Sequence, residues 1–265
     1  MVTDGEYIVE RLLPVFVQEI CREQHIDYRS FSDNWMLRLE RDGIRKWVIG
    51  YTFDLNPAAS VALSSDKVAS YQALTADGLP AIEHYLARSR ASAAVLAKNL
   101  TDVPHDRPVV IKPLQGASGH GIHLFSRLDE ATAYVSNQAH TDWTISPWYD
   151  IAAETRLIIG NGTLVHAYEK QNPVMRDGLL FYNLSMGARA IDIEPTTEMV
   201  QLSCDAVKSI GLNLAAVDIV TLADGSTRIL EINSGIMMEH YARQSDEYKN
   251  RARGVYGAII ESMFN

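Results

Sequence analysis

Hydrophobic and polar residues alternate along much of this chain in short runs that are typical of strands. These runs predict strands at 35–40, 44–51, 109–112, 122–125, 155–159, 163–168, 216–222 and 228–232. Three pairs of them flank Asp42-Gly43, Asn161-Gly162 and Asp224-Gly225, dipeptides that supply the positive φ angles of tight hairpin turns. Much of the predicted sheet structure is therefore made of hairpins.

Apolar residues at helical spacing, together with capping signals, predict helices between the strands. They are expected at 8–23, from 65–67 to just before Gly78, and at 89–100, 128–138, 195–210 and 239–263. Pro14 marks either a kink in the first helix or the first turn of a helix that begins later. Because the strands come as hairpins and outnumber the crossover helices, we expect an α+β fold with antiparallel sheets rather than a doubly wound parallel sheet.

Composition narrows the class of protein. The 265 residues are 47% hydrophobic and 22% charged, which is ordinary for a globular protein of one or two domains. A net charge of −9 argues against broad binding to nucleic acids or anionic membranes. Cys21 and Cys204 are the only cysteines, so neither a disulfide framework nor a cysteine metal site is expected. The N-terminus has neither a signal-peptide pattern nor a membrane-spanning stretch, and a cytoplasmic location is predicted.

The segment 107–122 carries the first chemical signal. An apolar run ends in Lys112, and a loop containing Gly116, Gly119 and Gly121 follows. Desolvating a lysine is costly unless the ammonium group has a partner, and successive glycine amides can close over phosphate oxygens. A glycine-rich hairpin with a surface lysine is the alternative. The pattern favours an anion site.

The hairpin at 224–225 carries the second signal. Its turn places Asp218 directly opposite Glu231, and Asn233 shares their face. Two carboxylates and an amide oxygen suit Mg²⁺, a hard cation that bridges phosphates. The alternative is a solvated polar face, but the apolar residues at 215–217 imply a buried sheet in which unpaired acids are costly. Together the two signals favour a site for Mg·ATP.

Other phosphate-binding motifs, namely the P-loop, the dinucleotide fingerprint and the kinase set, are missing from the sequence. Over about residues 60–240 the chain instead resembles the ATP-grasp superfamily of carboxylate–amine ligases. The matching pieces follow in family order: Ser65-Asp66-Lys67, Val110-Ile111-Lys112-Pro113 with its glycine loop, Glu154-Thr155-Arg156, Tyr168-Glu169-Lys170, Asn183-Leu184-Ser185-Met186-Gly187, and Val217-Asp218-Ile219 with Leu230-Glu231-Ile232-Asn233. The chain is similar to ribosomal-protein glutamate ligases, D-alanine–D-alanine ligases and cyanophycin synthetases.

The resemblance implies a role for each candidate residue. ATP would be bound by Lys67, Lys112, the loop residues Gly116, Ser118, Gly119 and Gly121, the hinge residues Trp148 and Tyr149, and Glu154 at the ribose. Asp218, Glu231 and Asn233 would hold one or two Mg²⁺ ions, or Mn²⁺ in their place. Lys170 would contact the γ-phosphate, and Arg156 and Arg189 are further catalytic candidates. Surface charge for the basic residues and core packing for the two aromatic residues are the alternatives.

The reaction implied is an ATP-dependent ligation. A carboxylate and an amine, both amino-acid-like, are joined through an acyl phosphate with release of ADP and phosphate. A phosphotransferase and a non-catalytic ATP-binding regulatory module are the alternatives. The second is motivated by Ala216 and Met186, which stand where relatives usually carry an arginine for the transferring phosphoryl group; Arg156 or Arg189 would have to replace it. The usual Ser-Pro-Gly after the metal asparagine is also changed, at 234–240, so the substrates of no single relative carry over.

The resemblance further implies an ATP-grasp fold, with two α+β subdomains that grip the nucleotide after a short N-terminal α/β region. The expected boundaries are 1–62 for that region, 63–145 for the subdomain with the glycine-rich lid, and 146–265 for the subdomain with the metal site. Small molecules, and not nucleic acids or membranes, are the expected partners. A homodimer is compatible with the sequence.

Overall fold

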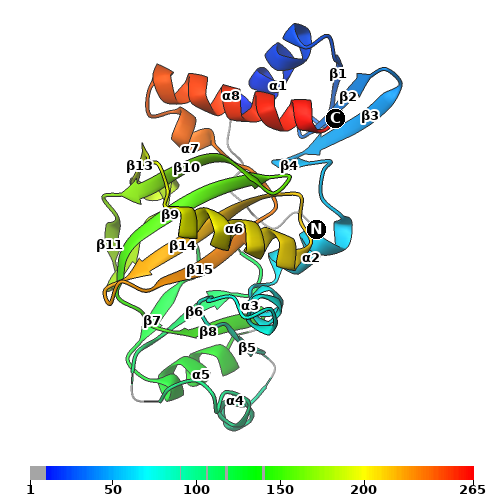
Figure 1. Cartoon of the computed structure of the whole chain (residues 1–265). Coiled ribbons are helices and arrows are strands. Elements are labelled where there is room, and N and C mark those ends of the chain that lie inside the picture. The colour runs from blue at the N-terminus through cyan, green and yellow to red at the C-terminus, as the bar shows by residue number, and fades with distance from the viewer. Residues whose placement is uncertain (1–9, 90, 106, 117–118, 139–140) are drawn as a thin grey trace.

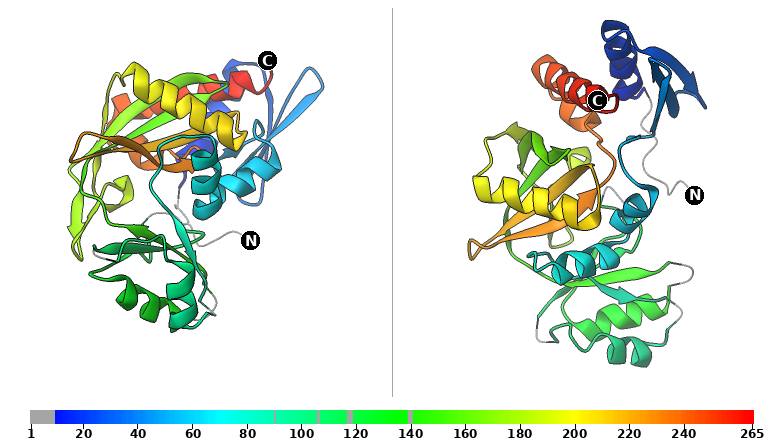
Figure 2. Two further views of the ribbon diagram at one scale, coloured as in Figure 1. Left: turned by 60° about the horizontal axis from the view of Figure 1, so that its bottom comes forward. Right: turned by 45° about the vertical axis from the view of Figure 1, so that its right-hand side comes forward.

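The computed structural model describes residues 10–89, 91–105, 107–116, 119–138 and 141–265. A five-stranded sheet forms the middle of the molecule, and a four-stranded sheet lies on either side of it (Figures 1 and 2). Strand pairing within all three sheets is antiparallel, so the predicted α+β class is confirmed. Throughout the described ranges, no helix is both long and apolar enough to cross a membrane.

The N-terminal part is a helix followed by a meander of four strands. Its elements are α1 (Leu12–Glu23), β1 (Asp27–Phe31), β2 (Met36–Arg41), β3 (Ile44–Ile49) and β4 (Thr52–Phe53). Asp42 and Gly43 both have positive φ, as the predicted turn between β2 and β3 requires. Pro14 lies in the first turn of α1, where a missing N–H costs no helical hydrogen bond.

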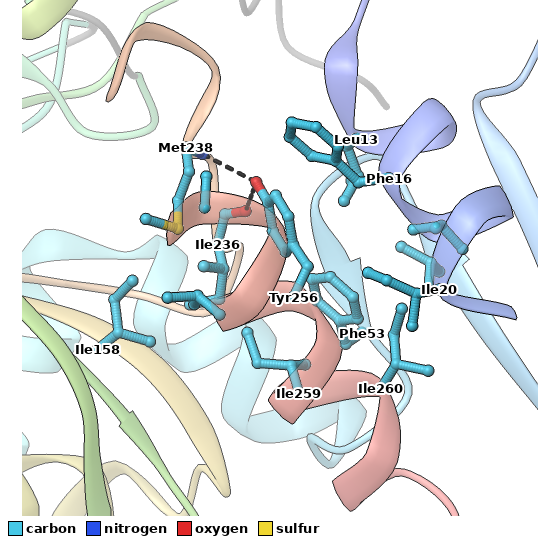
Figure 3. Packing of buried hydrophobic residues seen from close by; sticks show 14 of the residues in the cluster. Leu13, Phe16, Ile20, Phe53, Ile158, Ile236, Met238, Tyr256, Ile259 and Ile260 are labelled. Carbon is cyan, nitrogen blue, oxygen red and sulfur yellow. Dashed lines mark hydrogen bonds between the residues drawn. The ribbon is translucent and has the colours of Figure 1, made fainter. Parts of the chain in front are cut away.

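This part shares one hydrophobic core with the C-terminal helices α7 (Glu239–Ala242) and α8 (Asp246–Ser262). Phe16 and Phe53 each pack against Tyr256 of α8, with ring centroids 6.1 and 5.9 Å apart (Figure 3). The Tyr256 hydroxyl accepts a hydrogen bond from the Met238 N–H and donates one to the Ile236 carbonyl, at 3.0 and 3.1 Å. The core therefore also fixes the loop that precedes α7.

The central sheet has two differently covered faces. Its strands, in spatial order, are β13 (Arg189–Asp192), β10 (Thr163–Gln171), β9 (Ile151–Gly160), β14 (Leu214–Leu222) and β15 (Thr227–Asn233). Leu157 and Val217 pack under α6 (Thr197–Ile210), which lies across one face (Figure 1). Ile158 belongs to the core beneath α7 and α8, so Arg156, two residues earlier, shares that second face.

Two short helices precede the third sheet. α2 (Ala58–Ser65) and α3 (Lys67–Ala76) both contact α6, and Leu74 of α3 lies in the core beneath it. The chain then runs beside β15, where the Ile82 N–H donates to the Ile229 carbonyl at 2.9 Å. Residues 58–82 thus pack with the central sheet, and the predicted boundary at 63 lies inside α2.

The third sheet, which we call the lid, consists of β5 (Tyr85–Ala87), β8 (Trp143–Pro147), β6 (Val109–Pro113) and β7 (His123–Phe125), in that spatial order. Helices α4 (Ala93–Asn99) and α5 (Leu128–Ser136) supply Leu96 and Leu128 to its core. A hairpin of β11 (Val174–Arg176) and β12 (Leu179–Phe181) reaches the lid from the central part: a Cβ built at Gly178 would lie 3.3 Å from Leu124.

Two details of the predicted elements are corrected by the structure. The closing helix predicted at 239–263 is two helices, because the chain leaves helical geometry after α7 and Ser245 begins α8 as its N-cap. The turn at 224–225 is not a tight two-residue turn with two positive φ angles: only Gly225 has positive φ, and the Leu222 N–H donates to the Ser226 carbonyl. A register shift between Asp218 and Ile219 compensates for the wider turn.

Candidate functional site

The predicted acid pair lies on the second face of the central sheet. Asp218 on β14 pairs directly with Glu231 on β15, as the sequence indicated, and Ala216 pairs with Asn233. Asp218 is buried, whereas the Glu231 side chain is 35% exposed. In the described part of the chain, the buried Nδ2 atom of Asn233 has no hydrogen-bond partner. Two carboxylates and an amide with unused capacity therefore line neighbouring strands.

Arg156 on β9 is the register partner of Asp218 on the edge of β14 away from β15. Its Nε and Nη2 atoms donate to the two Asp218 carboxylate oxygens at 2.7 and 2.6 Å. Lys170 on β10 lies 3.2 Å from Asp218 Oδ1 and also donates to Glu154, its register partner on β9. Four predicted site residues thus form one cluster, in which each charge has an opposite charge beside it.

Opposite charges outweigh burial in this cluster. Burial alone would raise the pKa of Asp218, but Arg156 and Lys170 lower it to about 2. Burial and Arg156 act to lower the pKa of Lys170, yet Asp218 and Glu154 hold that pKa above its usual value. Asp218 is an anion and Lys170 a cation at neutral pH, as binding of phosphate and metal would require.

Two further lysines, Lys67 on α3 and Lys112 on β6, lie outside the central sheet and approach Glu231. Asp66 caps α3 by accepting from the Val68 and Ala69 amides, which sets Lys67 at the start of the helix. Lys67 Nζ lies 3.8 Å from Glu231 Oε1 and donates to the Gly116 carbonyl of the glycine loop at 3.0 Å. Lys112 is half-buried on β6; burial lowers its pKa, and the nearby Glu231 opposes that shift.

The described part of the glycine loop reaches β12 and Asn183, which follows it. Gly119 has a φ of +76°, and a Cβ built there would lie 3.2 Å from both Asn183 Oδ1 and a ring carbon of Phe181. Gly121 also has positive φ, and a Cβ built there would lie 3.0 Å from Cγ of Pro113. The loop therefore runs between Lys67, which donates to the Gly116 carbonyl, and the end of β12. Ser118 lies outside the described residues.

The hinge residues have partners of their own. The Trp148 N–H donates to the Pro108 carbonyl at 2.9 Å, and the Trp148 side chain is 36% exposed. The Tyr149 hydroxyl donates to Glu83 at 2.6 Å, and the guanidinium groups of Arg107 and Arg228 lie 5.1 and 5.0 Å from its ring centroid. Sequence reasoning missed these three charged partners, since no motif connects residues so far apart in the chain.

The two catalytic arginine candidates are placed differently. Arg156 lies within the cluster, whereas Arg189 is exposed at the start of β13 and pairs with Gln171. Adjacent residues on a strand point to opposite faces, so Arg189 lies on the face opposite Lys170. The structure thus brings Arg156, but not Arg189, together with the acids.

His84 is a buried polar residue of the site that sequence reasoning missed. It lies just before β5, and its Nδ1 atom is 2.7 Å from the Ser146 hydroxyl and 3.3 Å from that of Thr144. Burial lowers its pKa to about 3, with Lys112 and Lys67 adding to the effect. A lone histidine in a linker carries no sequence signal for such a position.

The donor set fits a hard divalent cation. Glu231 is partly exposed and therefore available. Asn233 would contribute its Oδ1 atom, since its Nδ2 atom is a donor and cannot bind a cation. Asp218 could join them only by giving up a contact to Arg156 or Lys170. Within the described ranges, no group of three or more histidine, cysteine or acidic residues forms a ready metal site. Asp218, Glu231 and Asn233 are the candidate ligands, and Glu154 on the same face pairs with Lys170.

Comparison with known proteins places the chain in a family. A model described as the RimK-like ATP-grasp domain matches residues 64–249. A probable alpha-L-glutamate ligase 2 of Pseudoalteromonas atlantica is 27% identical over 200 residues, which cover 74% of this chain and 64% of that protein. A probable alpha-L-glutamate ligase of Halorhodospira halophila is 27% identical over 224 residues, covering 82% and 69%. The chain thus spans a little under two thirds of the first relative's length.

Solved structures show the same fold. The D-cycloserine synthetase DcsG has a TM-score of 0.57 and 23% identity, over 75% of this chain and 71% of its own. A bifunctional glutathione synthetase from Pasteurella multocida has a TM-score of 0.59 and 14% identity, over 93% and 43%. Both likenesses confirm the predicted ATP-grasp fold. Because the family model covers well over half of the sequence, the chain belongs to the RimK-like ATP-grasp domain family.

Proposed function

We propose that this protein is an ATP-dependent ligase that joins a carboxylate to an amine through an acyl phosphate, with release of ADP and phosphate. The observation that carries the proposal is the meeting of two sets of residues. Lys67, Lys112 and the glycine loop approach from one side, and the Asp218 and Glu231 strands from the other. Family membership supports the same activity.

ATP binding would replace the present partners of Lys67 and Lys170 with phosphate oxygens. Lys67 now holds the Gly116 carbonyl, and Lys170 holds Glu154 and Asp218. A phosphate oxygen is a stronger acceptor for Lys67 than the neutral Gly116 carbonyl. Lys170 would exchange one carboxylate for phosphate, which would release Glu154 for the ribose hydroxyls. The ion pairs keep these buried charges compensated until the nucleotide replaces them.

Mg²⁺ would be held by Glu231 and Asn233, with Asp218 as a third ligand once it gives up a cationic contact. A divalent ion held there would supply positive charge to neutralise the phosphates. Mn²⁺, which also accepts oxygen ligands, is an alternative ion. Arg156, which faces Asp218, is the residue we assign to the charge on the transferring phosphoryl group in place of the missing family arginine.

The chemical steps need no covalent bond to the protein. A substrate carboxylate attacks the γ-phosphate and expels ADP, and the acyl phosphate is then attacked by an amine, which expels phosphate. Lys112 and Lys170 would neutralise phosphate charge, and the lid would hold the acyl phosphate away from water. Amino-acid-like substrates are supported by the names of the glutamate ligase relatives.

The segment that would face the acceptor is held rigidly. The Ile236 N–H donates to the Tyr51 carbonyl at 2.9 Å, and Tyr256 bonds both Ile236 and Met238. Glu239 then accepts hydrogen bonds from the first amides of α1. The N-terminal part thus braces the loop, and we infer that it shapes the acceptor pocket.

The test is an incubation with ATP, Mg²⁺ and a pool of amino acids, in which ADP, phosphate and new products are followed by chromatography and mass spectrometry. A ligase releases ADP and phosphate and yields a product whose mass is the sum of two substrates minus water. A phosphorylated compound that persists without an amine would identify a phosphotransferase instead. ATP binding with no turnover against any acceptor would indicate the non-catalytic module.

A further inference from the structure

His84 lies between the two halves of the proposed ATP site. It belongs to the linker between α3 and β5, which runs beside β15 at Ile82 and then enters the lid. His84 is only 5% exposed. Because both the lid sheet and the central sheet lie against this linker, a contact made by His84 to one can be coupled to a contact made to the other.

On the lid side, His84 Nδ1 lies within hydrogen-bond distance of the hydroxyl groups of Ser146, at 2.7 Å, and Thr144, at 3.3 Å. Both residues are on β8, and both are buried. Thr144 is the register partner of Lys112 on β6, so the two side chains share one face of the lid. His84 therefore contacts the strand directly beside the lysine proposed to bind phosphate.

On the other side, His84 lines one small cavity together with Leu230, Glu231 and Lys67. The Leu230 backbone acts to raise the pKa of His84, as a carbonyl that accepts from the ring would. A neutral imidazole whose Nδ1 accepts from the hydroxyls and whose Nε2–H donates to this carbonyl satisfies both sides. No other neutral side chain of this size presents a donor and an acceptor on opposite edges of a rigid ring.

We infer that His84 is a positioning residue for the nucleotide phosphates, which fixes Lys112 of the lid relative to Glu231 of the metal strand. The inference rests on the proposed function, since those two residues act together only if Mg-nucleotide binds between them. A lysine ammonium misplaced by a fraction of a hydrogen-bond length loses much of its contact to phosphate. The burial and pairing of Thr144 and Ser146 add a reason for the ring, because their hydroxyls would otherwise lack an acceptor there.

Three substitutions separate the two contacts. His84→Asn keeps an acceptor near the Nδ1 position, and His84→Gln keeps a donor near the Nε2 position, whereas His84→Phe keeps the ring and neither contact. Tyr134→Phe is the matched control, because it removes one hydrogen bond inside the lid, to His123 Nε2 at 3.1 Å. Calorimetric titrations with ADP and with AMP, each with Mg²⁺, then measure binding, and thermal unfolding reports folding.

We expect His84→Phe to weaken ADP binding by about tenfold or more while AMP binding changes by less than about threefold, since the β-phosphate would lie at the lysine and the metal strand. His84→Asn and His84→Gln should fall between His84→Phe and the wild type, and they test the inference if His84→Phe does not fold. A lower melting temperature with unchanged ADP affinity in all three variants would overturn it. Absence of ADP binding to the wild type would overturn the proposed function, and this inference with it.

Discussion

Asp218 is the residue on which the charge balance of the site depends. It is buried, yet it holds two cations: Arg156 through both carboxylate oxygens, and Lys170 through one. Removing one member of such a pair is more costly than replacing the whole pair, because the remaining charge stays buried. The residue scale therefore supplies predictions both for stability and for catalysis.

We expect Arg156→Met to lower the free energy of unfolding by about 3 kcal/mol at pH 7. The folded-state pKa of Asp218 is lowered from 3.8 to about 2, so the stability that this shift provides is complete above about pH 4 and is lost as the pH falls toward 2. The stability difference between wild type and variant should therefore narrow as the pH falls from 5 to 2.5, as measured by urea unfolding.

Arg253→Met is the control for that series, since Arg253 pairs with Glu19 and Glu23 at a more exposed position on α8. Arg253→Met should lower the free energy of unfolding by less than about 1 kcal/mol across the pH range. A constant difference between wild type and Arg156→Met from pH 7 to pH 2.5 would contradict the assigned pairing.

Glu231→Ala should abolish ATP turnover, because it removes a proposed metal ligand without emptying the core. Its side chain is 35% exposed, so we expect a change in the free energy of unfolding of less than about 1 kcal/mol. Coupled-enzyme detection of ADP, over a range of Mg²⁺ concentrations, is the measurement, and Glu130→Gln on the exposed side of α5 is the control. Near-normal ADP release would remove Glu231 from the site.

The sequence predicted which residues of the site pair along one hairpin, but not which residues join them from other strands. Asp218 and Glu231 are 13 residues apart and lie opposite each other as predicted, because the register shift after Asp218 offsets the wider turn. Arg156 reaches Asp218 only because β9 lies between β10 and β14, an order that depends on packing across the whole sheet. His84 depends on a linker path for which no local pattern exists.

At the scale of elements, the predicted hairpins and long helices are confirmed, and the short elements are those that sequence reasoning missed. α2 has eight residues, β4 has two and β13 has four, so none is long enough to show a clear period. The closing helix was predicted as one element over 239–263, across the polar stretch at 243–245 where Ser245 caps α8. Its break is a tertiary effect, since Glu239 of α7 turns toward α1 while α8 packs on both.

The glycine loop gives a prediction at this scale. Gly119→Ala should weaken Mg·ADP binding about tenfold, because a methyl group there meets Asn183 and Phe181 in addition to the strain of a positive φ. Gly43→Ala is the matched control, with a φ of +78° and no atom within 4 Å of its added Cβ. Both variants should lose about 1 kcal/mol of stability to backbone strain, and only the loop variant should lose affinity. Equal nucleotide affinities in calorimetry would contradict the placement of the loop.

At the scale of the molecule, the two ends of the chain fold onto each other. Figure 3 shows Leu13, Phe16 and Ile20 of α1 facing Tyr256, Ile259 and Ile260 of α8, around Phe53 of β4. Sequence reasoning assigned the first 62 residues to a separate short region. Contacts between residues more than 200 positions apart leave no trace in local periodicity, so this shared core could not be predicted from pattern alone.

The shared core predicts that a substitution in α1 affects both the stability of the molecule and the loop held by α8. Phe16 is 2% exposed and packs on Tyr256, and Phe16→Ala should lower the free energy of unfolding by about 3–5 kcal/mol. Phe31→Ala, which removes an equal ring from a half-buried position on β1, is the matched control and should cost less than half as much. Because Tyr256 also holds Ile236 and Met238 beside the site, the Phe16 variant should raise the KM of the acceptor while leaving ADP affinity within about threefold. Urea unfolding and steady-state kinetics measure the two effects, and equal losses of stability in both variants would show that the N-terminal part folds apart from α8.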